Sequence, residues 1–146
     1  MKTKLFGLVV LAGLIAAGAA LSASPPIIAR ALAVGETNGF SVHAKAGSMI
    51  VESLKVNPGG SFGWHTHGSA VAVVIKSGTL TVYDPTVANC AAQHVTAGQS
   101  FVEPANHLHL ARNEGKKPAT LYVVYLGVPK GAQPNAPGKA PTGCTS

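Results

Sequence analysis

The sequence predicts an all-β protein that folds as one barrel or sandwich of short strands. After the N-terminal leader, short runs rich in Val, Ile, Thr, Tyr and Phe recur, and clusters of Gly, Pro, Asn and Ser separate them. Helix signals are nearly absent from the same region. The chain has 146 residues, which is enough for one domain with one hydrophobic core and too few for two domains of ordinary size.

The expected strands follow one another closely and are bounded by turn residues. The first ends at the cluster 57–60, whose sequence NPGG has no strand propensity. Two consecutive runs, 71–76 and 79–83, flank the tight turn Ser77-Gly78 and are predicted to form one hairpin. A polar loop over residues 84–92 comes next. The predicted strands cover residues 49–56, 62–67, 71–76, 79–83, 93–95, 100–103, 107–112 and 119–127.

The N-terminus has the organisation of an export signal. Lys2 and Lys4 precede an apolar run over residues 5–21, and small residues with the pair Pro25-Pro26 follow it. We expect cleavage of a signal peptide, residues 1–31, and a secreted or periplasmic (extracytoplasmic) protein with no membrane contact after cleavage. The alternative is a retained anchor, because the apolar run approaches the roughly 20 residues that cross a bilayer.

The expected mature chain has three parts and a modest charge. An N-terminal extension, residues 32–41, leads into the barrel, residues 42–129, and a Pro/Gly-rich tail, residues 130–146, has a composition that does not form a core. Removal of the leader lowers the formal charge from +6 to about +3. Since no basic run is interleaved with aromatic residues, nucleic acid is not an expected partner.

Two cysteines, Cys90 and Cys144, are present in the chain. In an oxidising compartment two thiols tend to pair, so we predict a disulfide between them that ties the tail to the barrel. By the loop-entropy model such a link contributes on the order of 4 kcal/mol. The alternative, a reactive or metal-binding pair, requires both cysteines to lie near the histidines, which their spacing does not suggest.

Histidines occur in two alternating pairs that point to a metal centre. His65 and His67 leave the same face of an extended segment, and His107 and His109 repeat the spacing. Neutral imidazole suits divalent ions such as Fe, Mn, Zn, Cu or Ni, and the sequence leaves the identity of the ion open. The alternative is a set of half-buried polar residues satisfied by hydrogen bonds. His43 and His94 stand alone and are expected to be ordinary surface residues.

Two stretches resemble the motifs of the cupin superfamily. Residues 59–67, GGSFGWHTH, running on to Gly78, resemble the first motif, and residues 98–113, GQSFVEPANHLHLARN, resemble the second. Pro104, His109 and Asn113 are in place, whereas Asn106 stands where glycine is usual, a mild departure because asparagine also tolerates the left-handed conformation. The resemblance covers roughly residues 42–129 and is closest to exported bacterial single-domain cupins. It implies a double-stranded β-helix, also called a jelly-roll barrel.

The chain lacks the glutamate that the first motif commonly contains. Val71, or Ala72 with a shift of one residue, stands where cupins commonly place a glutamate ligand. The resemblance therefore implies a metal site of His65, His67 and His109. His107 is either a fourth nitrogen ligand or a residue at the rim, and Glu103 is a weaker candidate.

Two further residues have expected structural roles. Trp64 alternates with His65 and is expected to pack on the opposite face of the strand. Asn113 is expected to hold the turn after the second motif.

The sequence leaves three functions open. One is a dioxygenase-like metalloenzyme acting on a small molecule, because three neutral histidines leave positions for substrate and oxygen. Another is a non-catalytic extracytoplasmic module that binds a metal or a small ligand, and a third is a structural protein. Enzyme activity is undecided, because no convincing acid or base accompanies the histidines. Cupins often pair edge to edge, so a homodimer is compatible with the sequence.

Overall fold

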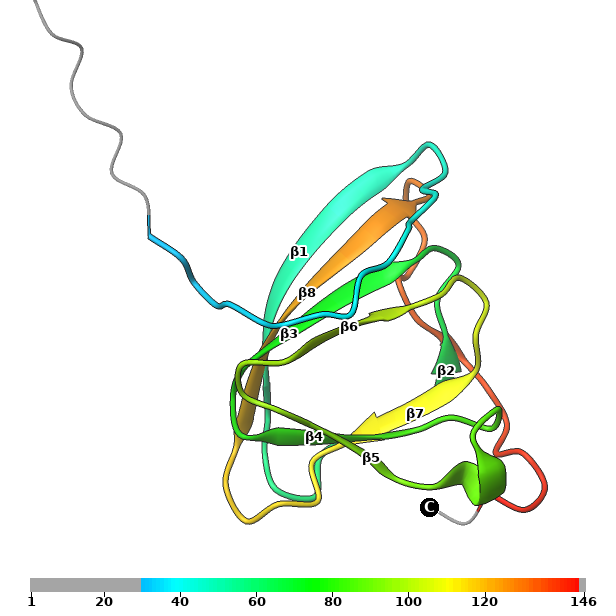
Figure 1. Cartoon of the computed structure of the whole chain (residues 1–146). Helices are drawn as coiled ribbons and strands as arrows, with labels where there is room; N and C mark the ends of the chain where they lie inside the picture. Colours follow the sequence, from blue (N-terminus) through cyan, green and yellow to red (C-terminus); the bar gives the residue numbers. More distant parts are fainter. Residues whose placement is uncertain (1–29, 145–146) are drawn as a thin grey trace, which may run out of the picture.

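The computed structural model describes residues 30–144, and nearly all of their regular structure is β-strand (Figure 1). Most of the predicted signal peptide, residues 1–29, lies outside the described residues. One short 3-10 turn, η1 (Ala88–Cys90), interrupts the strands. The strands are β1 (Ser48–Val56), β2 (Ser61–Thr66), β3 (Val71–Ser77), β4 (Thr79–Tyr83), β5 (Gln93–Thr96), β6 (Ser100–Glu103), β7 (His109–Arg112), β8 (Ala119–Val128) and β9 (Ala136–Pro137).

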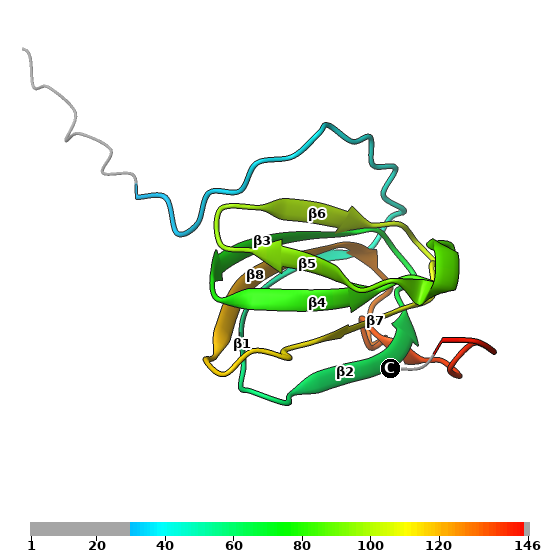
Figure 2. The ribbon, with the colours of Figure 1, turned by 60° about the horizontal axis from the view of Figure 1, so that its bottom comes forward.

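The strands form two antiparallel sheets that face each other. One sheet has the order β1-β8-β3-β6 and the other has the order β5-β4-β7-β2-β9. Figures 1 and 2 show these sheets as opposite walls of a barrel. Strand pairs far apart in the sequence build both walls, because β1 pairs with β8 and β2 pairs with β7. The all-β barrel predicted from the sequence is confirmed.

The predicted hairpin between residues 71–76 and 79–83 is wrong. β3 pairs with β6 and β8 in one sheet, whereas β4 pairs with β5 and β7 in the other. Gly78 links the two strands at a corner between the sheets, with φ of +78°. A Cβ atom at Gly78 would lie 2.8 Å from the Cα atom of Ala119. Ser77-Gly78 does form a turn. Both flanking strands are largely buried, however, and each pairs with other strands of the barrel.

The hydrophobic core fills the space between the two sheets. Along β8 buried and half-buried residues alternate, so that one face of the strand points inward. Val71 and Ile75 of β3 are fully buried in the same core. Burying such a side chain stabilises a protein by about 1.5–3 kcal/mol. The core contains Val56, Val71, Val73, Ile75, Leu80, Val82, Ala111, Leu121, Val123, Tyr125 and Val128.

A second, smaller cluster packs on the side of β2 opposite to the histidines. Trp64 and Leu110 lie there together with Tyr83, Cys90 and Cys144. The packing role expected for Trp64 is confirmed, because its side chain belongs to this cluster and is buried. The structure also joins Cys90 to Cys144 in a disulfide, which brings the C-terminal tail back to the body of the protein.

Two turns of the second motif take the conformations expected for them. Asn106 has φ of +61°, the left-handed region that asparagine tolerates better than most residues. Asn113 is almost fully buried, and its amide group donates to the carbonyl oxygens of Val56 and Lys117, each at 2.8 Å. Its own side-chain oxygen accepts from the backbone nitrogen of Gly115 at 2.9 Å. Asn113 therefore holds the turn together.

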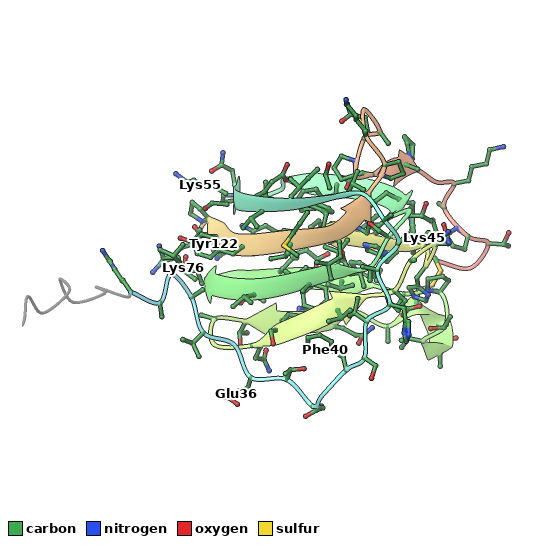
Figure 3. All side chains as sticks on the ribbon, turned by 90° about the horizontal axis from the view of Figure 1, so that it is seen from above. Glu36, Phe40, Lys45, Lys55, Lys76 and Tyr122 are labelled. Carbon is green, nitrogen blue, oxygen red and sulfur yellow. A yellow bond between two sulfur atoms is a disulfide. The ribbon has the colours of Figure 1, made fainter. Side chains whose placement is uncertain are left out.

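The segment before β1 runs along the outside of the first sheet. Glu36 forms a parallel bridge with Gln99, and the backbone of Ser100 donates to the carbonyl oxygen of Glu36 at 3.0 Å. Figure 3 shows Glu36 and Phe40 on this segment, next to the edge of the sheet. Among the described residues, the structure has no helix with the length and apolar character needed to cross a membrane.

Candidate metal centre

Three buried histidines meet inside the barrel. His65 and His67 come from β2, and His109 is the first residue of β7. The two strands are paired so that His65 stands directly opposite His109. One ring nitrogen from each histidine can be chosen so that all three lie within 4.8 Å of one another. This cluster can hold a metal ion.

Backbone carbonyl groups fix the orientation of all three rings. In each ring Nδ1 lies at hydrogen-bonding distance from a carbonyl oxygen, and only the protonated Nδ1–H can donate to it. Nε2 is then left with its lone pair, which is the form that binds metal. The bonds join His65 to Gly63 at 2.9 Å, His67 to Pro134 at 3.0 Å and His109 to His107 at 3.0 Å.

Glu103 brings a carboxylate to the same cluster. Its two oxygens lie 3.1 Å from Nε2 of His67 and 3.1 Å from Nε2 of His109. The residue ends β6 and is buried. From the sequence Glu103 was only a weak candidate, and no convincing acid or base accompanied the histidines. The structure corrects that expectation, because the pairing of β6 with β3 points the last residue of β6 inward.

The ring nitrogens and carboxylate oxygens that point into the cluster are hydrogen-bond acceptors, and they face one another. Nε2 of His67 and Nε2 of His109 are buried and have no hydrogen-bond partner among the described residues, although each lies close to Glu103. With the proton on Nδ1, each Nε2 faces a carboxylate oxygen as a second acceptor, and only a ring that is protonated on both nitrogens forms an ion pair with Glu103. Buried acceptors without donors are unfavourable, and a cation between them removes the cost. The set of imidazole nitrogens and one carboxylate fits a divalent transition metal.

The charge on Glu103 is favoured by its surroundings. Burial opposes ionisation, but the contacts with His109 and His67 outweigh it and lower the pKa of Glu103 to about 2. Burial lowers the pKa of His65, and the neighbouring His109 and His67 lower it further. Burial also opposes the charged form of His109, yet Glu103 raises the pKa of His109 above its usual value. Glu103 is therefore ionised at neutral pH and can offer its negative charge to a cation.

His107 lies outside the cluster. Its Nε2 is 2.9 Å from Oδ2 of Asp84. The other oxygen of this carboxylate, Oδ1, accepts hydrogen bonds from Thr86. The ring of His107 is stacked at 6.4 Å from the ring of His109, measured between centroids. β7 begins at His109 and not at residue 107 as expected, so His107 precedes the strand.

The two isolated histidines lie elsewhere. His94 contacts Thr81, with Nδ1 at 3.2 Å from Oγ1, and His43 is exposed.

Two cavities adjoin the cluster. The inner one lies between the sheets and leaves about 20 Å³, room for a water molecule but not for an organic ligand. His65, His67, Glu103, Tyr125 and Asn135 line it together with core residues. The outer one is a cleft of about 320 Å³, which is large enough for a small molecule. Its lining consists of Val82, Asp84, Gln93, Phe101, Val102, Glu103, Pro104, His107 and His109.

The family model of the cupin domain matches residues 53–125, which is half of the chain. This chain belongs to the cupin family. The match spans β2 and β7 and therefore contains all three clustered histidines and Glu103. A comparison with curated proteins finds no match for this cupin.

Solved structures resemble this cupin in fold. One is an uncharacterized conserved protein with a double-stranded β-helix domain from Klebsiella pneumoniae, with 22% identity, a TM-score of 0.52 and coverage of 73% of this chain and 86% of that chain. Another is the DMSP lyase DddQ from Ruegeria pomeroyi, with 15% identity, a TM-score of 0.52 and coverage of 63% and 44%. A third is the polyketide cyclase RemF from Streptomyces resistomycificus, with 18% identity, a TM-score of 0.49 and coverage of 56% and 56%.

The likenesses to the Klebsiella protein and to the lyase establish the fold and no more. The double-stranded β-helix expected from the sequence is confirmed, because the two sheets and the family match agree with it. The cupin described here spans about half the length of the cyclase and of the lyase. The activities of the cyclase and the lyase therefore do not extend to this cupin.

Proposed function

We propose that this cupin binds one divalent transition metal through His65, His67 and His109, with Glu103 as the fourth ligand. The observation that carries the proposal is the arrangement of acceptors. Three rings are tied at Nδ1 to backbone carbonyls, and the free nitrogens of His67 and His109 lie 3.1 Å from the carboxylate of Glu103. Fe, Mn, Zn, Cu and Ni are all compatible with this mixed nitrogen and oxygen set. His107 is not needed as a ligand, because it is paired with Asp84.

The proposed activity is that of a dioxygenase-like metalloenzyme acting on a small molecule. A bound metal of this kind supplies Lewis-acid or redox chemistry at positions that the protein leaves open. The outer cleft supports this activity, because it reaches Glu103 and His109 and its lining combines apolar residues with the polar pair Asp84 and His107. The cleft would orient the substrate, while the apolar core behind the cluster excludes water.

A non-catalytic binding module is the second candidate. The observation that favours it is the small inner cavity of about 20 Å³, which has room for a water-sized molecule next to the histidines and not for an organic substrate. In that case the barrel would store or carry the metal. The two candidates differ in turnover and not in the metal ligands.

We further propose that the protein works outside the cytoplasm. The predicted signal peptide supports this location, although its first 29 residues lie outside the described part of the chain. The disulfide between Cys90 and Cys144 fits an oxidising compartment, where such bonds persist. N-terminal sequencing of the exported protein would locate the cleavage site.

Elemental analysis of the purified protein tests the metal site. We expect about one equivalent of a divalent transition metal in the parent and in the control variant His94→Ala, because His94 lies outside the cluster. The double variant His65→Ala, His67→Ala should lose the metal while circular dichroism reports an unchanged fold. Equal metal content in the double variant and the parent would contradict the proposal.

Oxygen consumption separates the enzyme from the binding module. The metal-loaded protein is mixed with enediol, thiol or flavonol compounds, and the double variant serves as the blank. Substrate-dependent uptake that is absent from the blank supports the dioxygenase-like activity. Flat traces with every compound support the binding module and leave the metal site intact.

A further inference from the structure

The segment 134–138, called the strap below, lies along the edge of the strand that carries two of the histidines. Within it, β9 pairs with β2 at His65 and Thr66. The backbone nitrogen of Gly138 donates to the carbonyl oxygen of Trp64 at 2.7 Å. Figure 1 shows the C-terminal segment running past β2 towards the region of η1. A tail with a composition unsuited to a core is thus built into the second sheet.

Pro134 of the strap orients one of the metal-binding rings. Its carbonyl oxygen accepts the hydrogen bond from Nδ1 of His67 at 3.0 Å. The equivalent partners of His65 and His109 are two residues away from their histidines, whereas Pro134 is 67 residues away from His67. The orientation of His67 therefore depends on the strap staying in place, and that of the other two rings does not.

Asn135 of the strap faces the inner cavity with an unused acceptor. Its Oδ1 atom is buried and has no hydrogen-bond partner among the described residues. The residue lines the same cavity as His65 and His67. A buried acceptor of this kind is costly unless a donor reaches it, and the cavity has room for a water-sized donor.

The disulfide holds the strap at its far end. Cys144 is bonded to Cys90, which ends η1 and packs against Trp64 in the smaller cluster. The chain between Gly138 and Cys144 is short, so the bond limits how far the strap can move from β2. Without it, the strap would be retained mainly by the backbone hydrogen bonds of β9 and Gly138.

We propose that the strap is a working part of the metal centre. Pro134 is a positioning residue for His67, the disulfide keeps it there, and Asn135 accepts a hydrogen bond from a very small protic molecule at the centre, such as water or hydrazine. This inference rests on the proposed metal site. It adds that affinity for the metal depends on the Cys90–Cys144 bond and that selection among small ligands depends on Asn135.

Titration with Co²⁺ alone, followed by its visible absorption, tests the role of Pro134. The variant Cys90→Ala, Cys144→Ser should bind Co²⁺ about 10-fold to 100-fold more weakly than the parent, the usual loss when the partner of a ligating histidine is removed. The control Gln133→Ala, an exposed residue just before the strap, should match the parent. Nitrogen-15 NMR of the imidazoles should show that only His67 loses its fixed Nδ1–H form, which a general loss of stability would not produce.

The parent protein with its disulfide reduced and alkylated provides the same comparison if the double variant does not fold. Unchanged Co²⁺ affinity in either form, with the strap released, would overturn the positioning role while the metal site stands. A parent that binds no Co²⁺ at all would instead overturn the proposed function.

Binding of hydrazine and azide to the Co²⁺-loaded protein tests Asn135. Hydrazine has N–H donors and azide has none. Because one neutral hydrogen bond is at stake, Asn135→Ala should weaken hydrazine binding about threefold to tenfold and leave azide binding unchanged. Gln133→Ala should affect neither ligand. Equal effects on hydrazine and azide, or no effect on either, would contradict the role of Asn135.

Discussion

Glu103 stands directly opposite Val71 across the pairing of β3 with β6. Val71, or Ala72 with a shift of one residue, stands where the first cupin motif commonly has its glutamate. The carboxylate that is missing from β3 is thus replaced by one on the neighbouring strand, and its oxygens reach His67 and His109 at 3.1 Å. The cluster therefore still has a carboxylate, but this carboxylate comes from β6 and not from β3.

Replacement of Glu103 by glutamine should weaken metal binding without unfolding the protein. The neutral amide is a poorer ligand and removes the negative charge from the cluster, so we expect about 10-fold to 100-fold lower affinity in a Co²⁺ titration. Glu36→Gln, on the exposed N-terminal segment, is the matched control. If the combination of Val71→Glu with Glu103→Gln recovers part of the affinity, the two positions are interchangeable. An unaltered affinity in Glu103→Gln would remove Glu103 from the site.

Removal of the metal should lower the thermal stability of the parent. A ligand that binds only the folded state stabilises it by about 2.7 kcal/mol when its concentration is 100 times Kd. Differential scanning calorimetry with added metal and with a chelator should therefore give two clearly separated midpoints. The variant His65→Ala, His67→Ala should unfold at the same temperature in both solutions. If the chelator does not change the unfolding midpoint of the parent, that result would argue against a metal in the cluster.

The metal-free protein should have a pH window of extra stability that depends on Glu103. Its pKa is lowered to about 2 in the folded state, so its contribution is present above the usual 4.5 and is lost as the pH falls towards 2. His109 has a raised pKa, so its contribution is present below 6.5 and is lost as the pH rises through the raised value. The window lies between these two limits.

Urea unfolding of the parent and of Glu103→Gln across this pH range measures the window. The difference in unfolding free energy between the two proteins should be greatest in the weakly acidic region and should shrink on both sides. Chelator is present throughout, so that bound metal does not contribute. A difference that stays constant from pH 3 to about pH 8 would show that Glu103 and His109 do not interact as described.

The substitution Ile75→Ala should lower the free energy of unfolding strongly. This side chain is fully buried between the sheets, and Ile→Ala substitutions at such sites destabilise a protein by about 2–5 kcal/mol. Val51→Ala serves as the control, because Val51 is 64% exposed and its truncation should change the stability by no more than about 0.5 kcal/mol. Urea unfolding measures both. Similar losses in the two variants would contradict the position assigned to β3.

Much of this site could be predicted from local sequence. His65 and His67 are two residues apart on an extended segment, and that spacing is enough to place both rings on one face. Trp64 alternates with them and packs on the other side for the same reason. Asn106 and Asn113 were also predicted correctly, because turn conformation and side-chain capping depend on residues that are close in the chain.

Other features depend on contacts that the sequence does not specify. The runs 71–76 and 79–83 carry a hairpin signal, yet β3 and β4 enter different sheets because each finds longer-range partners. His107 has the same spacing to His109 as His65 has to His67, but it precedes β7 and pairs with Asp84. A pattern of alternation predicts a shared face only where the backbone is a strand at both residues.

The sequence by itself determined the all-β class, the cupin motifs and the three histidines, because alternation along a strand and turn chemistry are local properties of the chain. Tertiary structure decided that Glu103 joins the histidines and that Pro134 orients His67. Both residues reach the cluster through pairings between distant segments, β3 with β6 and β2 with β9. Such pairings are selected by the packing of the whole barrel, and no short stretch of residues encodes them.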